Sequence, residues 1–168
     1  MLSQPASDDA SHAPIEIVSY RPALAEAFWR LNVQWLERYF QLEEVDRVML
    51  ADPEHHVLAP GGELLFACRA GHAVGTCALL KAGEGVFELA KMCVDERCQG
   101  QGIGRRLLAA AIETFHRRGG RELFLESNSR LTTALRLYEA AGFVRQDGPR
   151  PGSHYRRADV YMIYRPTR

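Results

Sequence analysis

The chain has 168 residues, of which 46% are hydrophobic and 25% charged, as in ordinary globular domains. A domain of about this length buries roughly 70% of its unfolded surface, so one core suffices. Its 21 basic and 21 acidic side chains give zero formal net charge, and without an overall field we expect neither nucleic acid nor membrane as a partner.

The first segment, Met1–Pro14, is rich in Ala, Ser, Asp and Pro and contains no Lys or Arg. It therefore lacks the basic start and apolar run of a secretory signal. No stretch of the chain reaches the length of about eighteen apolar residues that a membrane span needs. We expect a flexible tail over 1–14, a single domain over 15–168 and a cytoplasmic location.

The first half of the domain starts with an alternating strand over Ile15–Ser19. Pro22 then occupies a first-turn position of a helix, which carries an apolar stripe at spacings of three or four. The stripe consists of Leu24, Phe28, Leu31, Trp35 and Tyr39. A second helix is expected over Glu43–Leu50, ending near Pro53. Because His55 and His56 are adjacent, they cannot share a face, and we expect no metal site.

Strands dominate the middle of the chain. Leu64–Arg69 and Ala73–Lys81 are predicted to form a hairpin through Gly71, and Val86–Val94 to form the next strand. A helix over Gly102–Arg118 follows, and then come further elements in the order strand, helix, strand and strand. These lie at 123–128, after Thr132, around Phe143 and over Asp159–Tyr164. The four cysteines, which form no C-x-x-C pair, are expected to be free thiols.

A glycine-rich loop, Gln99–Gly104, joins the Val86–Val94 strand to the following helix. Glycines allow positive φ and close approach of a ligand, and the first turn of a helix has amide N–H groups without intrahelical partners. Together the glycines and these free amides favour the binding of an anion. A dinucleotide fingerprint would need glycine in place of Arg105, and a P-loop would need Gly-Lys followed by Ser or Thr, so neither pattern fits.

Read from Gln99, the loop matches Q/R-x-x-G-x-G/A and resembles the pyrophosphate loop of the GNAT superfamily of acetyl-CoA-dependent N-acetyltransferases. Leu123–Asn128 is similar to the next strand of that family. Ala134–Phe143 resembles its A-x-x-L-Y-x-x-x-G-F signature. The resemblance runs from near Tyr20 to the C-terminus. It implies an α/β (α+β) GNAT fold, a mixed central sheet of about seven strands flanked by about four helices.

The resemblance implies acetyl-CoA as cosubstrate and assigns its contacts. Backbone groups of Met92, Cys93 and Val94 would hold the pantetheine arm like an added strand. The loop would bind the pyrophosphate through Gln99, Gly100, Gln101, Gly102, Ile103, Gly104 and Arg105. Asn128 resembles a coenzyme-side position, although its spacing to Ala134 is longer than the usual N-x-x-A.

Tyr138 stands at the family's general-acid position, where a phenol protonates the coenzyme thiolate. A phenol with an ordinary pKa of about 10 is protonated at neutral pH and needs no large shift to serve. The alternative is an aromatic side chain that only packs on the apolar stripe with Leu135 and Ala141.

Glu88 is the candidate general base, acting directly or through water, and it coincides with the glutamate that some family members use. Strand alternation places it on one face with Val86, Ala90, Met92 and Val94, where apolar neighbours would raise its pKa. The alternative is a solvated or salt-bridged strand glutamate.

The acceptor site of the family is lined by regions that here contain Trp35, Tyr39, Phe40, Arg150, His154 and Tyr155. Each of these side chains could equally be packing or surface. We expect an N-acetyltransferase that acts on a primary amine of a small metabolite, amino acid or peptide, with small molecules favoured. The alternative is an acyl-CoA-binding regulatory protein with weak or no turnover. Exposed strand edges make a homodimer plausible.

Overall fold

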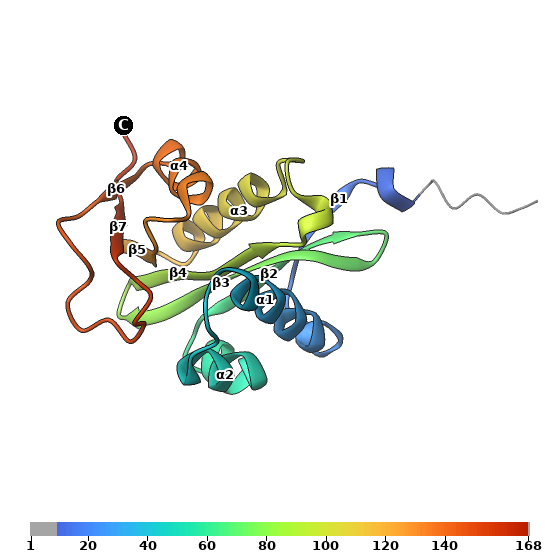
Figure 1. The fold of residues 1–168 in the computed structure, drawn as a ribbon, viewed down its shortest axis with the longest axis horizontal. Coiled ribbons are helices and arrows are strands. Elements are labelled where there is room, and N and C mark those ends of the chain that lie inside the picture. The colour runs from blue at the N-terminus through green and yellow to red at the C-terminus, as the bar shows by residue number, and fades with distance from the viewer. Residues whose placement is uncertain (1–9, 168) are drawn as a thin grey trace, which may run out of the picture.

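The computed structural model describes residues 10–167 (Figure 1). Most of the predicted N-terminal tail, residues 1–9, lies outside this range. Its remainder includes a short 3₁₀ helix, Ala10–His12. None of the described helices is long and apolar enough to cross a membrane.

The domain is built on one seven-stranded sheet with the order β1-β2-β3-β4-β5-β7-β6. Its strands are β1 Ile15–Ser19, β2 Glu63–Arg69, β3 His72–Gly83, β4 Val86–Val94, β5 Glu122–Ser127, β6 Phe143–Arg145 and β7 Val160–Tyr164. The first four form an antiparallel meander, β5 is parallel to β4, and β7 is antiparallel to both β5 and β6. This mixed sheet confirms the predicted fold class.

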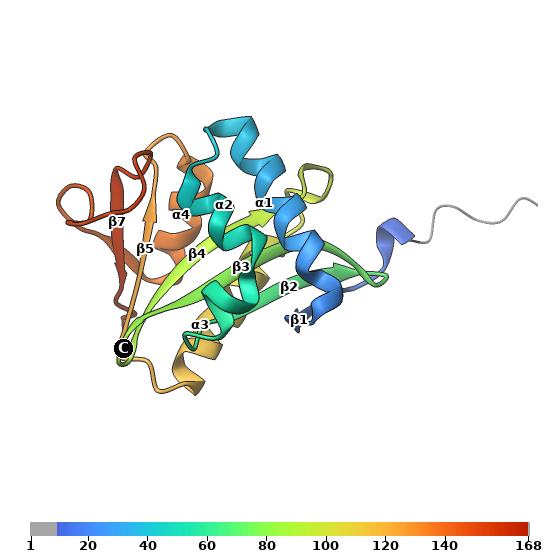
Figure 2. The same ribbon diagram turned by 90° about the horizontal axis from the view of Figure 1, so that it is seen from below.

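Helices cover both faces of the sheet, as Figures 1 and 2 show. They are α1 Ala25–Tyr39, α2 Glu44–Ala51, α3 Ile103–Arg117 and α4 Thr132–Ala141. One core, which includes Leu107 and Phe115, lies under α3 and α4, and the other, which includes Phe28 and Phe66, lies under α1. Leu24, Phe28 and Leu31 of the predicted stripe therefore face the sheet. Trp35 and Tyr39, at the far end of that stripe, line the cavity described below. A single π-helical turn, Glu54–Leu58, follows α2 and was not predicted.

The sheet opens between β4 and β5. These strands pair only from Val86↔Glu122 to Leu89↔Leu125, although β4 continues to Val94 and β5 to Ser127. Figure 2 shows the two strands diverging from this short paired stretch. Beyond it, the β5-facing edge of β4 has backbone donors and acceptors without a strand partner.

A β-bulge in β4 changes which side chains share a face. Thr76 pairs with Cys93 and Ala78 with Ala90, so β4 has one extra residue between these pairs. Lys91, at this bulge, has a φ of 52°, which is rare for a residue with a side chain. Met92 and Val94 consequently pack into the α3 core with Phe87 and Leu89. The expectation that they share a face with Glu88 is wrong, because regular alternation stops at the bulge.

Candidate functional site

A cavity of about 570 Å³ lies at the opening between β4 and β5. Its walls come from the end of α1, from β4, from the loop before α3, from the end of β5, from the start of α4 and from the segment before β7. Of the predicted site residues, all line this cavity except Gln101 of the glycine loop and the acceptor-side candidates Arg150 and His154. The Gln101 side chain instead accepts a hydrogen bond from the Arg69 guanidinium, at 2.7 Å.

The glycine loop has the backbone geometry expected of an anion-binding loop. Gly100 and Gly102 have φ values of 76° and 77°, and a Cβ on either would meet no atom within 4 Å. Glycine is therefore required there by the backbone conformation, and the space beside it is open. The Arg106 N–H is the first amide of α3 that donates a helical hydrogen bond, to the Gly102 carbonyl at 3.2 Å. The amides at the preceding positions 103–105 have no hydrogen-bond partner in the described part of the chain.

The open edge of β4 borders the same cavity, through Met92, Cys93 and Val94. The Cys93 side chain is buried in the α1 core, and burial raises the pKa of its thiol. That thiol is therefore protonated and unreactive at neutral pH. At Cys93, the groups available to a ligand are therefore those of the backbone.

Tyr138 is buried on α4 with 9% of its surface exposed, and it lines the cavity. Its ring packs edge-on against Phe143, with centroids 6.0 Å apart, so the packing interpretation is correct as far as it goes. Among the described residues its hydroxyl has no hydrogen-bond partner. Burial raises the pKa of this phenol, which keeps it a proton donor at neutral pH.

Glu88 lines the cavity from β4 and makes no ion pair with any side chain that the structure describes. Burial and the negative charge of Glu126 raise its pKa to about 7, against the opposing charges of Arg150 and Lys91. A carboxylate with that pKa is half ionised near neutral pH, as a general base should be. Glu126, which lines the cavity from the end of β5, was not singled out from the sequence.

A buried ionic network, also unforeseen, closes one side of the cavity. Asp46 of α2, fully buried, accepts from Lys91 Nζ at 2.5 Å and from the two terminal nitrogens of Arg157 at 2.7 and 2.8 Å. Arg157 also donates to Glu43 at 2.9 Å. Burial by itself would raise the pKa of Asp46, but the Arg157 hydrogen bond and the Lys91 charge lower it to about 2. The one sequence signal was a lysine within the otherwise apolar end of β4.

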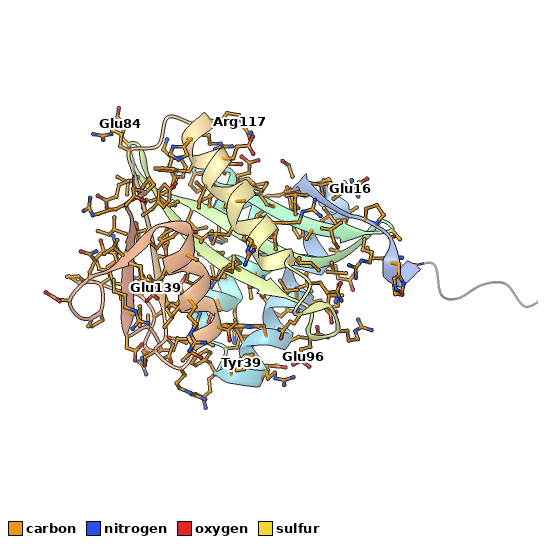
Figure 3. The ribbon with its side chains drawn as sticks, turned by 90° about the horizontal axis from the view of Figure 1, so that it is seen from above. Glu16, Tyr39, Glu84, Glu96, Arg117 and Glu139 are labelled. Atoms are coloured by element: carbon orange, nitrogen blue, oxygen red, sulfur yellow. The ribbon has the colours of Figure 1, made fainter. Side chains whose placement is uncertain are left out.

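Aromatic side chains form another part of the cavity wall. The Trp35 ring lies 5.4 Å from that of Tyr39 and 5.9 Å from that of Phe40. Tyr155 lies against the Lys91 ammonium at 4.8 Å and the Arg157 guanidinium at 4.9 Å. Burial raises the pKa of its phenol. Tyr39 stands at the same end of the molecule as Glu96 in Figure 3, where Arg38 and Glu96 form an ion pair.

The other predicted positions have structural partners. Asn128 borders the cavity, but its amide donates to the Arg157 carbonyl at 2.7 Å and its oxygen accepts from the Arg130 N–H at 2.9 Å. It therefore ties the turn after β5 to the segment before β7. Arg150 lies over the Phe124 ring at 4.2 Å, and neither it nor His154 lines the cavity.

Several solved structures share this fold. A GNAT-family acetyltransferase from Staphylococcus aureus Mu50 superposes with a TM-score of 0.81 at 22% identity, over 90% of this chain and 98% of that one. The yncA protein of Salmonella typhimurium, solved with its cofactor acetyl-CoA, superposes with a TM-score of 0.68 at 19% identity. The match covers 90% of this chain and 92% of that one. The ribosomal-protein-S18-alanine N-acetyltransferase of Escherichia coli superposes with a TM-score of 0.70 at 21% identity. The match covers 90% of this chain and 93% of that one. No curated protein sequence matches.

At 19–22% identity these superpositions show the shared fold alone. Residues 23–143 match the sequence model of the Acetyltransferase (GNAT) family, and the chain belongs to that family. Acyl transfer from acetyl-CoA is the chemistry that its members share.

Proposed function

We propose that this protein transfers the acetyl group of acetyl-CoA to a primary amine of a small metabolite, amino acid or peptide, with Glu88 as general base and Tyr138 as general acid. One observation carries the proposal. A carboxylate that titrates near neutrality and a protonated phenol line the same cavity, beside the open edge of β4 and the glycine loop.

The residues present fit acetyl-CoA. Gly100 and Gly102 leave open space beside a row of free amides, which suits a pyrophosphate, and Arg105 adds a positive charge to the same loop. The unpaired edge at Met92–Val94 suits the amide groups of a pantetheine arm. When bound, acetyl-CoA supplies the acetyl group as a thioester, whose C–S bond breaks as the C–N bond of the amide forms.

Glu88 and Tyr138 accept and donate the protons that this acyl transfer requires. An amine reaches the cavity largely as its ammonium ion, which is not a nucleophile, and Glu88 takes a proton from that nitrogen directly or through water. Tyr138 Oη gives its proton to the departing sulfur. The nitrogen loses its second proton once the C–N bond has formed, and this proton restores the phenol while the proton held by Glu88 passes to solvent. The burial that raises the pKa of both groups suits each to its role, because the carboxylate becomes more basic and the phenol stays protonated.

The first experiment measures release of the coenzyme thiol from acetyl-CoA across a panel of amines, amino acids and peptides. Tyr138→Phe should lower kcat by about 100-fold or more, the range for loss of a general acid. Tyr164→Phe is the matched control, because that ring also packs on Phe143, at 5.3 Å, but does not line the cavity.

Two results would contradict the proposal. Equal kcat losses in Tyr138→Phe and Tyr164→Phe would remove Tyr138 from the chemistry. Calorimetric binding of acetyl-CoA without turnover of any amine would instead favour an acyl-CoA-binding regulatory protein.

A further inference from the structure

The Glu126 carboxylate occupies an unusual place in the cavity. Its Oε1 atom is buried and has no hydrogen-bond partner, and the side chain lines the cavity at the point where β5 leaves β4. A buried carboxylate oxygen without a donor is costly for a folded protein. Such a group is explained if a ligand supplies the missing donor.

Glu126 and Glu88 lie on the same face of the sheet. Glu88 of β4 pairs in register with Phe124 of β5, and Glu126 is two residues after Phe124 on β5. Strand alternation therefore places all three side chains on one face of the sheet. The intervening Leu123 and Leu125 pack into the α3 core on the opposite face. Two carboxylates therefore border one cavity from adjacent strands.

The nearby cations are already engaged. Lys91 pairs with Asp46, and Arg157 pairs with both Asp46 and Glu43. Arg150 lies over the Phe124 ring at 4.2 Å. In the described part of the chain none of these cations forms an ion pair with Glu88 or Glu126. The acceptor end of the cavity thus contains two carboxylates that form no ion pair in the described part of the chain. The aromatic rings beside them already carry the protein's own cations, Lys91 and Arg157 on Tyr155 and Arg130 on Phe40.

We propose that Glu126 and Glu88 together bind the ammonium group of the acceptor, and that the acceptor is an alkyl or arylalkyl amine without a carboxylate beside the reacting nitrogen. This proposal rests on the proposed acetyltransferase function. The ammonium would supply donors to Glu126 Oε1 and to Glu88, and Glu88 would then remove its proton. A carboxylate one carbon from that nitrogen would face like charges, which are strongly unfavourable in a buried site.

Three acceptors that differ only beside the nitrogen test this discrimination. They are phenethylamine, phenylalaninamide, which adds a neutral group of similar size, and phenylalanine, which adds a negative charge. We expect kcat/KM for phenethylamine and phenylalaninamide to exceed that for phenylalanine by about 100-fold or more, corresponding to about 2.7 kcal/mol.

The variant Glu126→Gln keeps the shape of the side chain and removes its charge. We expect it to raise the KM for phenethylamine about tenfold or more, to narrow the discrimination against phenylalanine, and to shift the titration of Glu88 to lower pH, because the charge of Glu126 raises that pKa. Glu122→Gln is the matched control, since Glu122 lies on the same strand, is exposed and does not line the cavity.

Calorimetry of phenethylamine with the coenzyme-free protein gives a readout that does not depend on turnover. Weaker binding in Glu126→Gln but not in Glu122→Gln supports the ammonium site. Unchanged binding and KM in Glu126→Gln would overturn it. Acetylation of phenylalanine as fast as phenethylamine would overturn it too and leave the acetyltransferase proposal intact, whereas no acetylation of any amine would overturn both.

Discussion

At the scale of single residues, the pKa of Glu88 should be visible in catalysis. Burial and the Glu126 charge raise that pKa to about 7, and only the ionised form can accept a proton. We expect kcat/KM to rise with pH through an inflection near 7. Glu88→Gln should lose this inflection and about 100-fold or more of the activity. A pH profile of wild type and variant with one amine measures both, and an inflection retained in Glu88→Gln would assign it to another group.

The same residue should make stability depend on pH. The pKa of Glu88 is about 7 when folded and 4.5 as an unperturbed glutamate, so the folded state holds the extra proton between these values. The free energy of unfolding should therefore fall as pH rises from 5 to 8, with a contribution on the order of 2 kcal/mol from this group. Urea unfolding measures this effect. The free energy of unfolding of Glu88→Gln minus that of the wild type should be larger at pH 8 than at pH 5. A constant difference at both pH values would contradict the shift.

At the scale of secondary-structure elements, Asp46 joins α2 to the β4 bulge and to the segment before β7 through Lys91 and Arg157. Asp46→Asn leaves the buried Lys91 ammonium without its counter-charge, and we expect a loss of about 3–5 kcal/mol in urea unfolding. The exposed Glu44→Gln on the same helix is the control and should lose little. Because the pKa of Asp46 is lowered to about 2, the wild-type advantage should persist above pH 4 and disappear as pH falls toward 2. An advantage that stays constant down to pH 2 would show that the Asp46 charge is not its source.

The glycines at the two ends of α3 offer a matched comparison. Gly102 and Gly119 have φ values of 77° and 68°, and a Cβ on either would meet nothing within 4 Å. An alanine at either position should therefore cost about 1–2 kcal/mol of stability, because of backbone strain alone. Only Gly102 borders the cavity, so only Gly102→Ala should weaken acetyl-CoA binding in calorimetry. Equal coenzyme affinities in the two variants would remove the loop from the binding site.

Elements with local signals were predictable from the sequence. Gly102 and Gly119 bracket α3, and the predicted range of 102–118 differs from the observed Ile103–Arg117 by one residue at each end. The β4 bulge has no such signal, because a lysine with φ of 52° is held by its tertiary partners. The Asp46–Arg157 pair joins positions 111 residues apart in the chain, and only the folded sheet brings them together.

At the scale of the whole molecule, the strand order was beyond sequence reasoning. Periodicity and glycine positions predict the order of helices and strands along the chain, and the family resemblance implies the mixed sheet. The insertion of β7 between β5 and β6 depends on packing across the entire sheet. The resemblance to a family directed attention to the glycine loop and to Met92–Val94, which border the cavity. Glu126 lies within the strand that resembles the family, but its position in the cavity and the Asp46 network depend on contacts between segments far apart in the chain.

The sheet consists of two parts that share only a short seam. The β1–β4 meander and the β5-β7-β6 group pair through Val86–Leu89 and Glu122–Leu125, and the proposed coenzyme site extends this seam along the open edge of β4. A ligand bound there contacts both parts of the sheet and stabilises only the folded chain. At 100 times its Kd, acetyl-CoA should add about 2.7 kcal/mol, which for a domain of this size raises Tm by about 5–10 °C. A thermal scan with and without acetyl-CoA measures the shift, and Gly102→Ala should show a smaller one than Gly119→Ala at the same coenzyme concentration. Hydrogen exchange should slow at the amides of positions 103–105, which have no hydrogen-bond partner among the described residues, and at those amides of Met92–Val94 that point away from β3, toward the open edge. Protection confined to other surfaces would place the coenzyme elsewhere and separate the opening of the sheet from its binding.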